Sequence, residues 1–316
     1  MVAQRKPWIC IKDQIKILQN RGMSITDPDK AERYLRNINY YRLSGYWHAF
    51  RKSENRVFSE QFVDGTCFSN IVDLYYFDKR LRLTLLDAIE RIEIAIRTNL
   101  CHLLGEYDPI AHLDTKYLNS VYANQILKSG KTRYQEWQQN HTKQINRRKT
   151  RSTFIQHNIK KYGDELSVWV ACEAWDFGLL SHMFKMLKPE DKTKISLSYN
   201  IASGVVLESW IHTINDIRNI CSHHDRLWNN KMKIRPKYHP LLSHLHQFKD
   251  NHDEFNFYLS RVFTVIIIIN EFIKAINPTS KWVARINSLI NDFPSHDNGR
   301  VNLIEMGVPD NWQEYI

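Results

Sequence analysis

Arg218 and His223, five positions apart, are the side chains in this sequence best suited to chemistry on an anion. A guanidinium is always charged and presents a planar fork of donors that can hold an anion. An imidazole can take up or release a proton near neutral pH. Asn219 adds a fixed donor and acceptor between them, and Arg226 supplies a second cation three positions beyond His223. We interpret Arg218, Asn219 and His223 as candidate catalytic residues and Arg226 as a supporting one.

The spacing of apolar residues predicts that a helix carries this group. Across residues 207–221 the apolar side chains recur every three or four positions: Leu207, Trp210, Ile211, Ile214, Ile217 and Cys221. Against this apolar face runs a series of polar residues: Asn215, Arg218, Asn219, Ser222, His223, Arg226 and Asn229. A surface helix usually carries Lys and Glu there, so this composition favours a functional face. The alternative is that Arg218 and His223 form a buried polar pair that fixes how the helices pack.

The geometry of an ideal helix separates the two candidates. Five residues correspond to about 7.5 Å along the axis and roughly 140° around it. Arg218 and His223 therefore do not lie side by side on a straight helix. Either the helix starts or kinks within the motif, or two copies of the chain supply Arg and His to a shared cleft. We expect a homodimer.

The chain is basic, with a net charge of +10, which favours an anionic partner, nucleic acid before membrane. The most basic stretch is residues 128–161, where ten Lys and Arg face one acid, Glu136. Our candidate RNA-binding residues there are Lys143, Arg147, Arg148, Lys149 and Arg151, with the aromatics Tyr134, Trp137 and Phe154 interleaved. The alternative is a solvated, partly mobile connector.

A second candidate surface is the aromatic segment 39–47, NYYRLSGYW. Its three Tyr and one Trp are typical of an aromatic mini-core closed by a turn at Gly45. They could instead stack on RNA bases, with Arg42 on a phosphate.

Composition and periodicity predict an all-α protein, since 10 Gly and 9 Pro leave few tight turns. Short helices are expected over residues 8–50, a loop or hairpin over 50–68, and a long helix over 71–104. Within that helix, the polar faces carry Asp78, Lys79, Arg80, Arg82, Glu90, Arg91, Glu93 and Arg97. Glu93 and Arg97 should pair, and the spacing of Arg97 and His102 is treated as coincidental.

The rest of the chain is expected to be helical as well. Residues 165–187 should form an apolar helix or helix pair, with a break at Gly178 and with Glu173 and Asp176 buried. One of the two, with Glu173 our candidate, would hold an arginine of the central helix. Residues 255–291 should form one long helix and the last 25 a tail. We divide the chain into an N-terminal block (1–67), a core (68–230) with the basic insert, and a C-terminal extension (231–316).

Five scattered cysteines without a C-x-x-C are typical of a reducing compartment. The N-terminus lacks the apolar core of a signal peptide, and the most apolar run, residues 262–269, is too short to span a membrane. We expect a cytoplasmic protein with no membrane partner. His239, His244, His246 and His252 fit no common zinc spacing, so neither a metal nor another cofactor is expected.

Several separated blocks of this sequence resemble the Abi-like (AbiD/AbiF-type) abortive-infection proteins of bacteria. They are residues 14–22, 39–47, 77–82, 89–98, 169–181 and 218–229. The resemblance implies a HEPN-like helical bundle with an Arg-x4-6-His motif, which Arg218, Asn219 and His223 match. Many HEPN proteins are metal-independent ribonucleases and dimeric toxins, so the resemblance implies a role in phage defence.

The chemistry of the candidate residues agrees with RNA cleavage. Histidine can take the proton of the 2′-hydroxyl or protonate the leaving 5′-oxygen, and arginine can stabilise the charge that builds on the phosphorane. The products would be a 2′,3′-cyclic phosphate and a 5′-hydroxyl. Such a toxin would have to be silenced by an antitoxin or a regulatory RNA. The alternatives are a non-catalytic RNA-binding protein or a phage-sensing interaction protein on the same scaffold.

Overall fold

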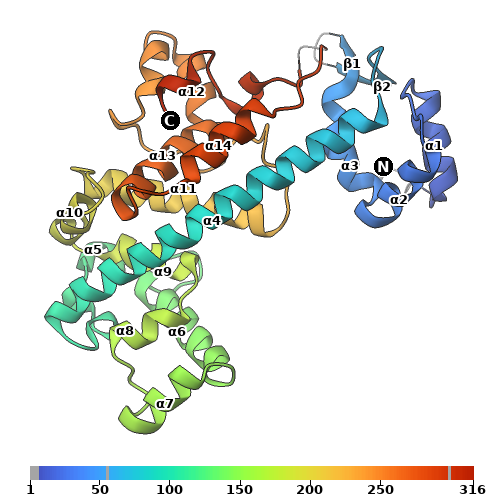
Figure 1. The fold of residues 1–316 in the computed structure, drawn as a ribbon. Coiled ribbons are helices and arrows are strands. Elements are labelled where there is room, and N and C mark those ends of the chain that lie inside the picture. Colours follow the sequence, from blue (N-terminus) through green and yellow to red (C-terminus); the bar gives the residue numbers. More distant parts are fainter. Residues whose placement is uncertain (1–6, 55–56, 298–299) are drawn as a thin grey trace.

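One helix, α4 (Phe68–Tyr107), runs through the whole molecule in the computed structural model, which describes residues 7–54, 57–297 and 300–316 (Figure 1). Its 40 residues correspond to a length of about 60 Å. Leu85, Ile89, Ile92, Ile96 and Leu100 recur every three or four positions, and all are buried. This confirms the long helix predicted from that spacing. The first six residues, part of the segment read for a signal peptide, lie outside the described residues.

The N-terminal block packs against the beginning of α4. It contains α1 (Ile11–Asn20), α2 (Pro28–Ile38) and α3 (Tyr40–Trp47), followed by a hairpin of β1 (Arg51–Glu54) and β2 (Val57–Phe62). Asp27 caps α2 by accepting a 2.8 Å hydrogen bond from the Lys30 backbone N–H. The predicted short helices and hairpin are confirmed. Tyr46 and Trp47 are core residues, whereas Tyr41 is 66% exposed.

The opposite end of α4 carries a second group of helices (Figure 1). They are α5 (Ser120–Ala123), α6 (Arg133–Lys149), α7 (Thr153–Tyr162), α8 (Val168–Ala171), α9 (Phe177–Met186) and α10 (Pro189–Leu197). The predicted break at Gly178 is wrong, because Gly178 lies inside α9. That helix begins after Asp176, whose carboxylate accepts a 2.8 Å bond from the Leu179 N–H and caps it.

The middle of α4 contacts α11 (Gly204–Ser222) on one side and the C-terminal helices on another. The single helix predicted for 255–291 is wrong: the chain forms α12 (His252–Leu259), α13 (Val262–Ile276) and α14 (Trp282–Asn291). Pro278 lies between the last two and cannot continue a helix. The apolar run 262–269 is the buried part of α13, as predicted. The predicted tail is also wrong, because Val301, Met306 and Val308 are buried in the core.

The protein is all-α, and the sheet found among the described residues is the two-stranded hairpin. Short 3-10 helices cover His48–Phe50, Ala111–Leu113, Thr115–Tyr117, Cys172–Ala174, Ser243–Phe248, Leu303–Met306 and Trp312–Glu314. Within the described ranges, no helix combines the length and the apolar character that a membrane crossing requires. No group of three or more His, Cys, Asp or Glu in those ranges is placed to hold a metal ion.

Candidate functional site

Arg218 lies in the second-last turn of α11 and is partly buried against α4. Its Nη1 is 3.4 Å from the Asn219 Oδ1, and no ion pair engages it among the residues that the structure describes. Glu93 of α4 is close enough for its carboxyl to be affected by the Arg218 charge. Burial raises the pKa of the Glu93 carboxyl, while the Arg97 and Arg218 guanidiniums oppose that shift. Arg218 therefore retains donors that an anion could take.

His223 lies where α11 ends. The helix stops at Ser222, and the exposed His223 caps it with φ −86° and ψ 3°. His224 follows in the left-handed conformation, with φ 60°. The N–H of His224 donates to the Cys221 carbonyl at 3.1 Å and that of Asp225 to the Ile220 carbonyl at 3.0 Å, which is a Schellman ending.

This ending bears on the predicted separation of Arg218 and His223. The sequence left two ways to bring them together, a helix that starts or kinks within the motif, or a dimer. The helix neither starts nor kinks within the motif: the His223 N–H keeps the helical bond to the Asn219 carbonyl at 2.9 Å, and the chain leaves the helix only after His223. The ideal separation of about 140° therefore still applies to Arg218 and His223. A non-glycine residue in the left-handed region costs about 1–2 kcal/mol, so the turn at His224 must be held by its surroundings.

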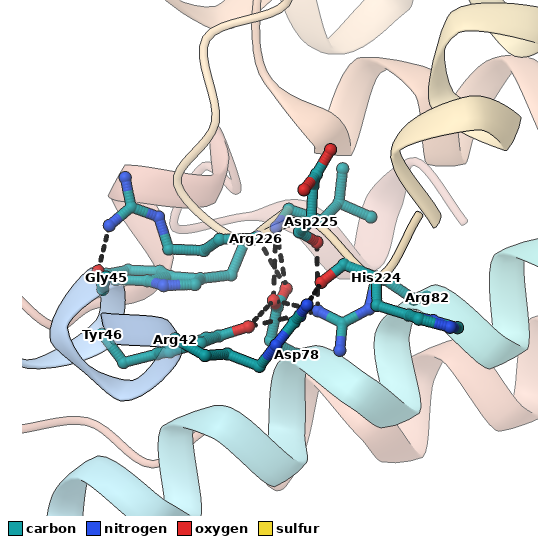
Figure 2. A network of polar contacts seen from close by, with 10 residues as sticks. Arg42, Gly45, Tyr46, Asp78, Arg82, His224, Asp225 and Arg226 are labelled. Carbon is teal, nitrogen blue, oxygen red and sulfur yellow. Dashed lines mark hydrogen bonds and ion pairs between the residues drawn. The ribbon is translucent and has the colours of Figure 1, made fainter. Parts of the chain in front are cut away.

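Asp78 of α4 holds the segment that follows this turn (Figure 2). Its carboxylate accepts hydrogen bonds from the backbone N–H groups of Leu227 (3.2 Å) and Trp228 (2.8 Å). It also accepts from the Tyr46 hydroxyl of α3 at 2.7 Å, and it pairs with Arg82 one turn along α4. One buried carboxylate thus joins three segments that are far apart in the sequence.

The groups around Asp78 act on each other's ionisation. Burial raises the pKa of the Asp78 carboxyl, and the Arg82 charge and the three donated hydrogen bonds oppose that. Burial and the Asp78 charge raise the pKa of the Tyr46 hydroxyl, so Tyr46 stays a donor. Arg82 Nη1 also donates to the Asp225 carbonyl at 3.2 Å. The Asp78 and Arg82 side chains of α4 therefore fix the backbone of residues 225–228.

Two further arginines pin the same loop to α3. Arg42 Nη1 donates to the His224 carbonyl at 2.6 Å, and Arg226 Nη1 donates to the Gly45 carbonyl (Figure 2). Gly45 lies inside α3 rather than in the predicted turn. Arg42, predicted to bind RNA phosphate, and Arg226, predicted to support catalysis, both hold the loop in this structure. Arg42 is exposed, so its remaining donors face solvent.

Asp78 and Arg82 were predicted on the polar faces of the long helix, and that placement is wrong. Their side chains are 0% and 5% exposed. A signal was available in the sequence. Extending the apolar series of α4 backwards from Leu85 by steps of three and four gives 82, 78, 74 and 71, which lie on the buried stripe.

The predicted burial of Glu173 and Asp176 is also wrong, since both are exposed. Asp176 caps α9 and accepts a 2.8 Å bond from Gln144. The carboxylate near Arg218 is that of Glu93, which forms the predicted pair with Arg97 at 2.7 Å. A helix break before α9 turns both acids outward, and periodicity in an all-apolar stretch does not reveal such a break.

The basic segment is ordered as α6 and α7 rather than as a connector. Lys143, Arg147, Arg148, Lys149 and Arg151 are exposed, and Lys149 pairs with Asp164 at 3.2 Å. Tyr134 and Trp137 are buried instead of lying on an RNA-stacking surface. The end of α6 and α7 lie at one extremity of the molecule (Figure 1). The loop after α11 contacts the N-terminal block, so the structure does not bring the two candidate regions together.

The protein is all-α, and residues from three sequence blocks meet at the loop after α11. The blocks are 39–47, 77–82 and 218–229. The model of the Abi-like protein family matches residues 33–229. The chain therefore belongs to the Abi-like protein family, and this membership suggests a role in abortive infection or phage defence. No curated protein and no solved structure matches the chain.

Proposed function

We propose that the protein is a metal-independent, HEPN-type RNA endonuclease that acts as a toxin in abortive infection. The observation that carries the proposal is the difference in bonding partners between Arg218 and the other arginines near the loop after α11. Arg42, Arg82 and Arg226 are engaged by backbone carbonyls or by Asp78. In the described part of the chain, the Arg218 side chain hydrogen-bonds to that of Asn219 alone, and the exposed His223 lies five residues further along.

These groups supply what cleavage of a phosphodiester requires. The 2′-oxygen attacks phosphorus, the bond to the 5′-oxygen breaks, a proton leaves the 2′-hydroxyl and a proton reaches the 5′-oxygen. The imidazole of His223 can carry out either proton transfer. The guanidinium of Arg218 stabilises the negative charge on the non-bridging oxygens of the transition state. Asn219, whose carbonyl accepts the His223 N–H at 2.9 Å, connects the two positions.

The proposal includes a homodimer, because Arg218 and His223 do not lie side by side on α11. Two copies meeting at the ends of α11 would form two clefts, each with Arg218 from one copy and His223 from the other. In healthy cells an antitoxin or a regulatory RNA would have to silence this activity. The exposed cations of α6 and α7 are available to bind either RNA.

The test is cleavage of RNA in EDTA, with the ends of the products analysed. His223→Ala should abolish cleavage, and Arg218→Lys, which keeps the charge but loses the planar fork, should leave only part of it. His224→Gly keeps the left-handed turn and His252→Ala removes an exposed histidine elsewhere; both should remain active. Full activity of His223→Ala would refute the ribonuclease and leave RNA binding or phage sensing on this scaffold.

The dimer has a separate test, in which Arg218→Ala and His223→Ala protomers are mixed. If a cleft takes Arg from one copy and His from the other, a mixed dimer has one intact cleft and activity partly returns. If both come from one copy, every cleft lacks a group and the mixture stays inactive.

A further inference from the structure

A cavity of about 430 Å³ opens between the C-terminal half of α4 and the segment of α8 and the following 3-10 helix. Its lining includes Arg97, His102, Trp169 and Glu173, together with the buried Cys101 and Cys172. The volume lies in the range of cavities that hold small organic ligands. Nothing in the cleavage chemistry proposed above uses this cavity.

Trp169 gives the cavity an aromatic wall. Its indole lies against α4 at Gly105, where a Cβ atom would meet the six-membered ring at 3.4 Å. The helix thus supports the ring from one side, while 52% of the residue stays exposed. A tryptophan held in place and half-exposed beside a cavity is suited to stacking on a planar ligand, and each base stacked on an aromatic side chain adds substantially to affinity.

The charged groups of the cavity fall into two sets. Arg97 is engaged by Glu93 at 2.7 Å and by the Trp175 carbonyl at 3.0 Å, and Glu106 pairs with Lys194 at 2.6 Å. Within the described ranges, no hydrogen bond or ion pair engages the side chain of Glu173 or that of His102. Glu173 is close enough to Cys101 that its charge, after the Cys172 thiol and burial, raises the pKa of the Cys101 thiol. The Cys101 thiol is therefore uncharged, and the free acceptor is the Glu173 carboxylate.

We propose that this cavity binds a guanine base, either in an RNA strand or in a free nucleotide. An ionised carboxylate only accepts hydrogen bonds, and its two oxygens match two adjacent donors. The Watson–Crick edge of guanine offers such a pair, N1–H and N2–H. Adenine and cytosine each present one amino group beside an acceptor, and uracil presents one N–H between two carbonyls. Stacking on Trp169 with pairing to Glu173 therefore selects guanine.

The proposal of a guanine site rests on the proposed ribonuclease function. The cavity would set the base preference of that ribonuclease. Arg97 lines the cavity, and its partner Glu93 is the α4 carboxylate near Arg218. Along α4, Cys101 lies about 29 Å from Arg82, which holds the loop after His223. An RNA strand with a guanine in the cavity would thus follow α4 and α11 towards His223, and cleavage would fall several nucleotides from the bound guanine.

The experiment measures binding of the full chain, with His223→Ala to prevent cleavage, to GMP, to AMP, and to oligoadenylate with or without one guanosine. Guanine ligands should bind more tightly. Trp169→Leu should weaken guanine binding roughly 5- to 150-fold, the range for one stacked base. Glu173→Gln should shift the preference from guanine towards adenine, because an amide can accept from N6–H and donate to N1.

Two matched controls are Trp8→Leu, which removes an 87% exposed tryptophan, and Glu254→Gln, which removes an exposed carboxylate on α12. Both should bind like the parent. Preference for GMP without preference for guanosine in RNA would assign the cavity to a free nucleotide. Equal binding of all ligands, or a preference that survives both Trp169→Leu and Glu173→Gln, would overturn the proposal. Cleavage by the parent chain is measured separately. The guanine-binding proposal can therefore be refuted without refuting the ribonuclease proposal.

Discussion

Arg42 Nη1 donates a 2.6 Å hydrogen bond to the backbone carbonyl of His224, a residue 182 positions further along the chain. The bond fastens the one strained residue of the loop to the N-terminal block. We expect Arg42→Ala to loosen the turn, so that the amide hydrogens of His224 and Asp225 exchange faster with solvent. Cleavage should fall while the affinity for RNA changes little.

Arg36→Ala is the control, because Arg36 is exposed on α2 and pairs with Glu32. If Arg42 binds RNA phosphate instead, Arg42→Ala will weaken RNA binding and leave amide exchange unchanged. That result would favour the interpretation made from the sequence over the one made from the structure.

Asp78→Ala should be severely destabilising. It leaves the Arg82 charge buried and unpaired, which costs about 3–5 kcal/mol of unfolding free energy. The exposed pair of Arg80 and Asp292, 3.0 Å apart, supplies the control: Asp292→Ala should cost about 0–1 kcal/mol. Urea unfolding followed by circular dichroism measures both.

A double variant tests whether Asp78 is more than the partner of Arg82. Apolar replacement of a buried ion pair is often neutral, so Asp78→Leu with Arg82→Met would restore stability if the pair were all that mattered. We expect it not to, because the N–H groups of Leu227 and Trp228 would lose their acceptor.

The basic end of the molecule should bind RNA through its charge. Replacing Arg147, Arg148, Lys149 and Arg151 with Ala should lower RNA affinity and reduce the slope of log K against log salt by up to about 3, since each phosphate contact contributes about 0.7. Lys149 should contribute least because Asp164 already pairs with it. Lys12, Lys16, Lys30 and Arg33, exposed in the N-terminal block, give a control with the same loss of charge and no expected effect on the slope.

Acid should unfold the protein in part through two buried histidines. Burial lowers the pKa of His112 to about 3 and of His141 to about 4. The unfolded chain takes up these protons near pH 6.5, so stability is full above that value and falls as the pH drops towards 4 and 3, by up to about 1.4 kcal/mol per pH unit for each group.

His112→Leu should flatten this pH dependence. Neither ring nitrogen of His112 has a hydrogen-bond partner among the described residues, so the replacement sacrifices no bond. Unfolding free energy measured between pH 7 and 4 checks the prediction. An unchanged slope would show that other groups dominate acid unfolding.

Much of the fold could be predicted because apolar spacing reports burial directly. The long helix α4, the short N-terminal helices, the hairpin and the buried part of α13 all follow from periodicity and stop signals. Periodicity failed where the chain is apolar on every side. The break before α9 depends on the Asp176 cap, and the break before α13 on tertiary contacts such as the bond from Arg261 to the Asn229 carbonyl, rather than on pattern.

The catalytic candidates could be found from residue chemistry, but the way they are held could not. Asp78 is buried because it meets two backbone N–H groups 149 and 150 positions away, and no local pattern contains such a contact. The same applies to Arg42 and Arg226, whose charges suggested RNA before their carbonyl partners were visible. An arginine in a sequence shows its charge and not what it contacts.

The Asp78 network also has a consequence for the order in which the protein is made. Tyr46, Asp78 and Arg82 leave the ribosome long before Leu227 and Trp228, and until those two residues appear the carboxylate lacks its backbone donors. A nascent or truncated chain that stops short of Trp228 therefore cannot order the loop that carries His223. Synthesis itself delays the appearance of an ordered His223 loop until about three-quarters of the chain exists.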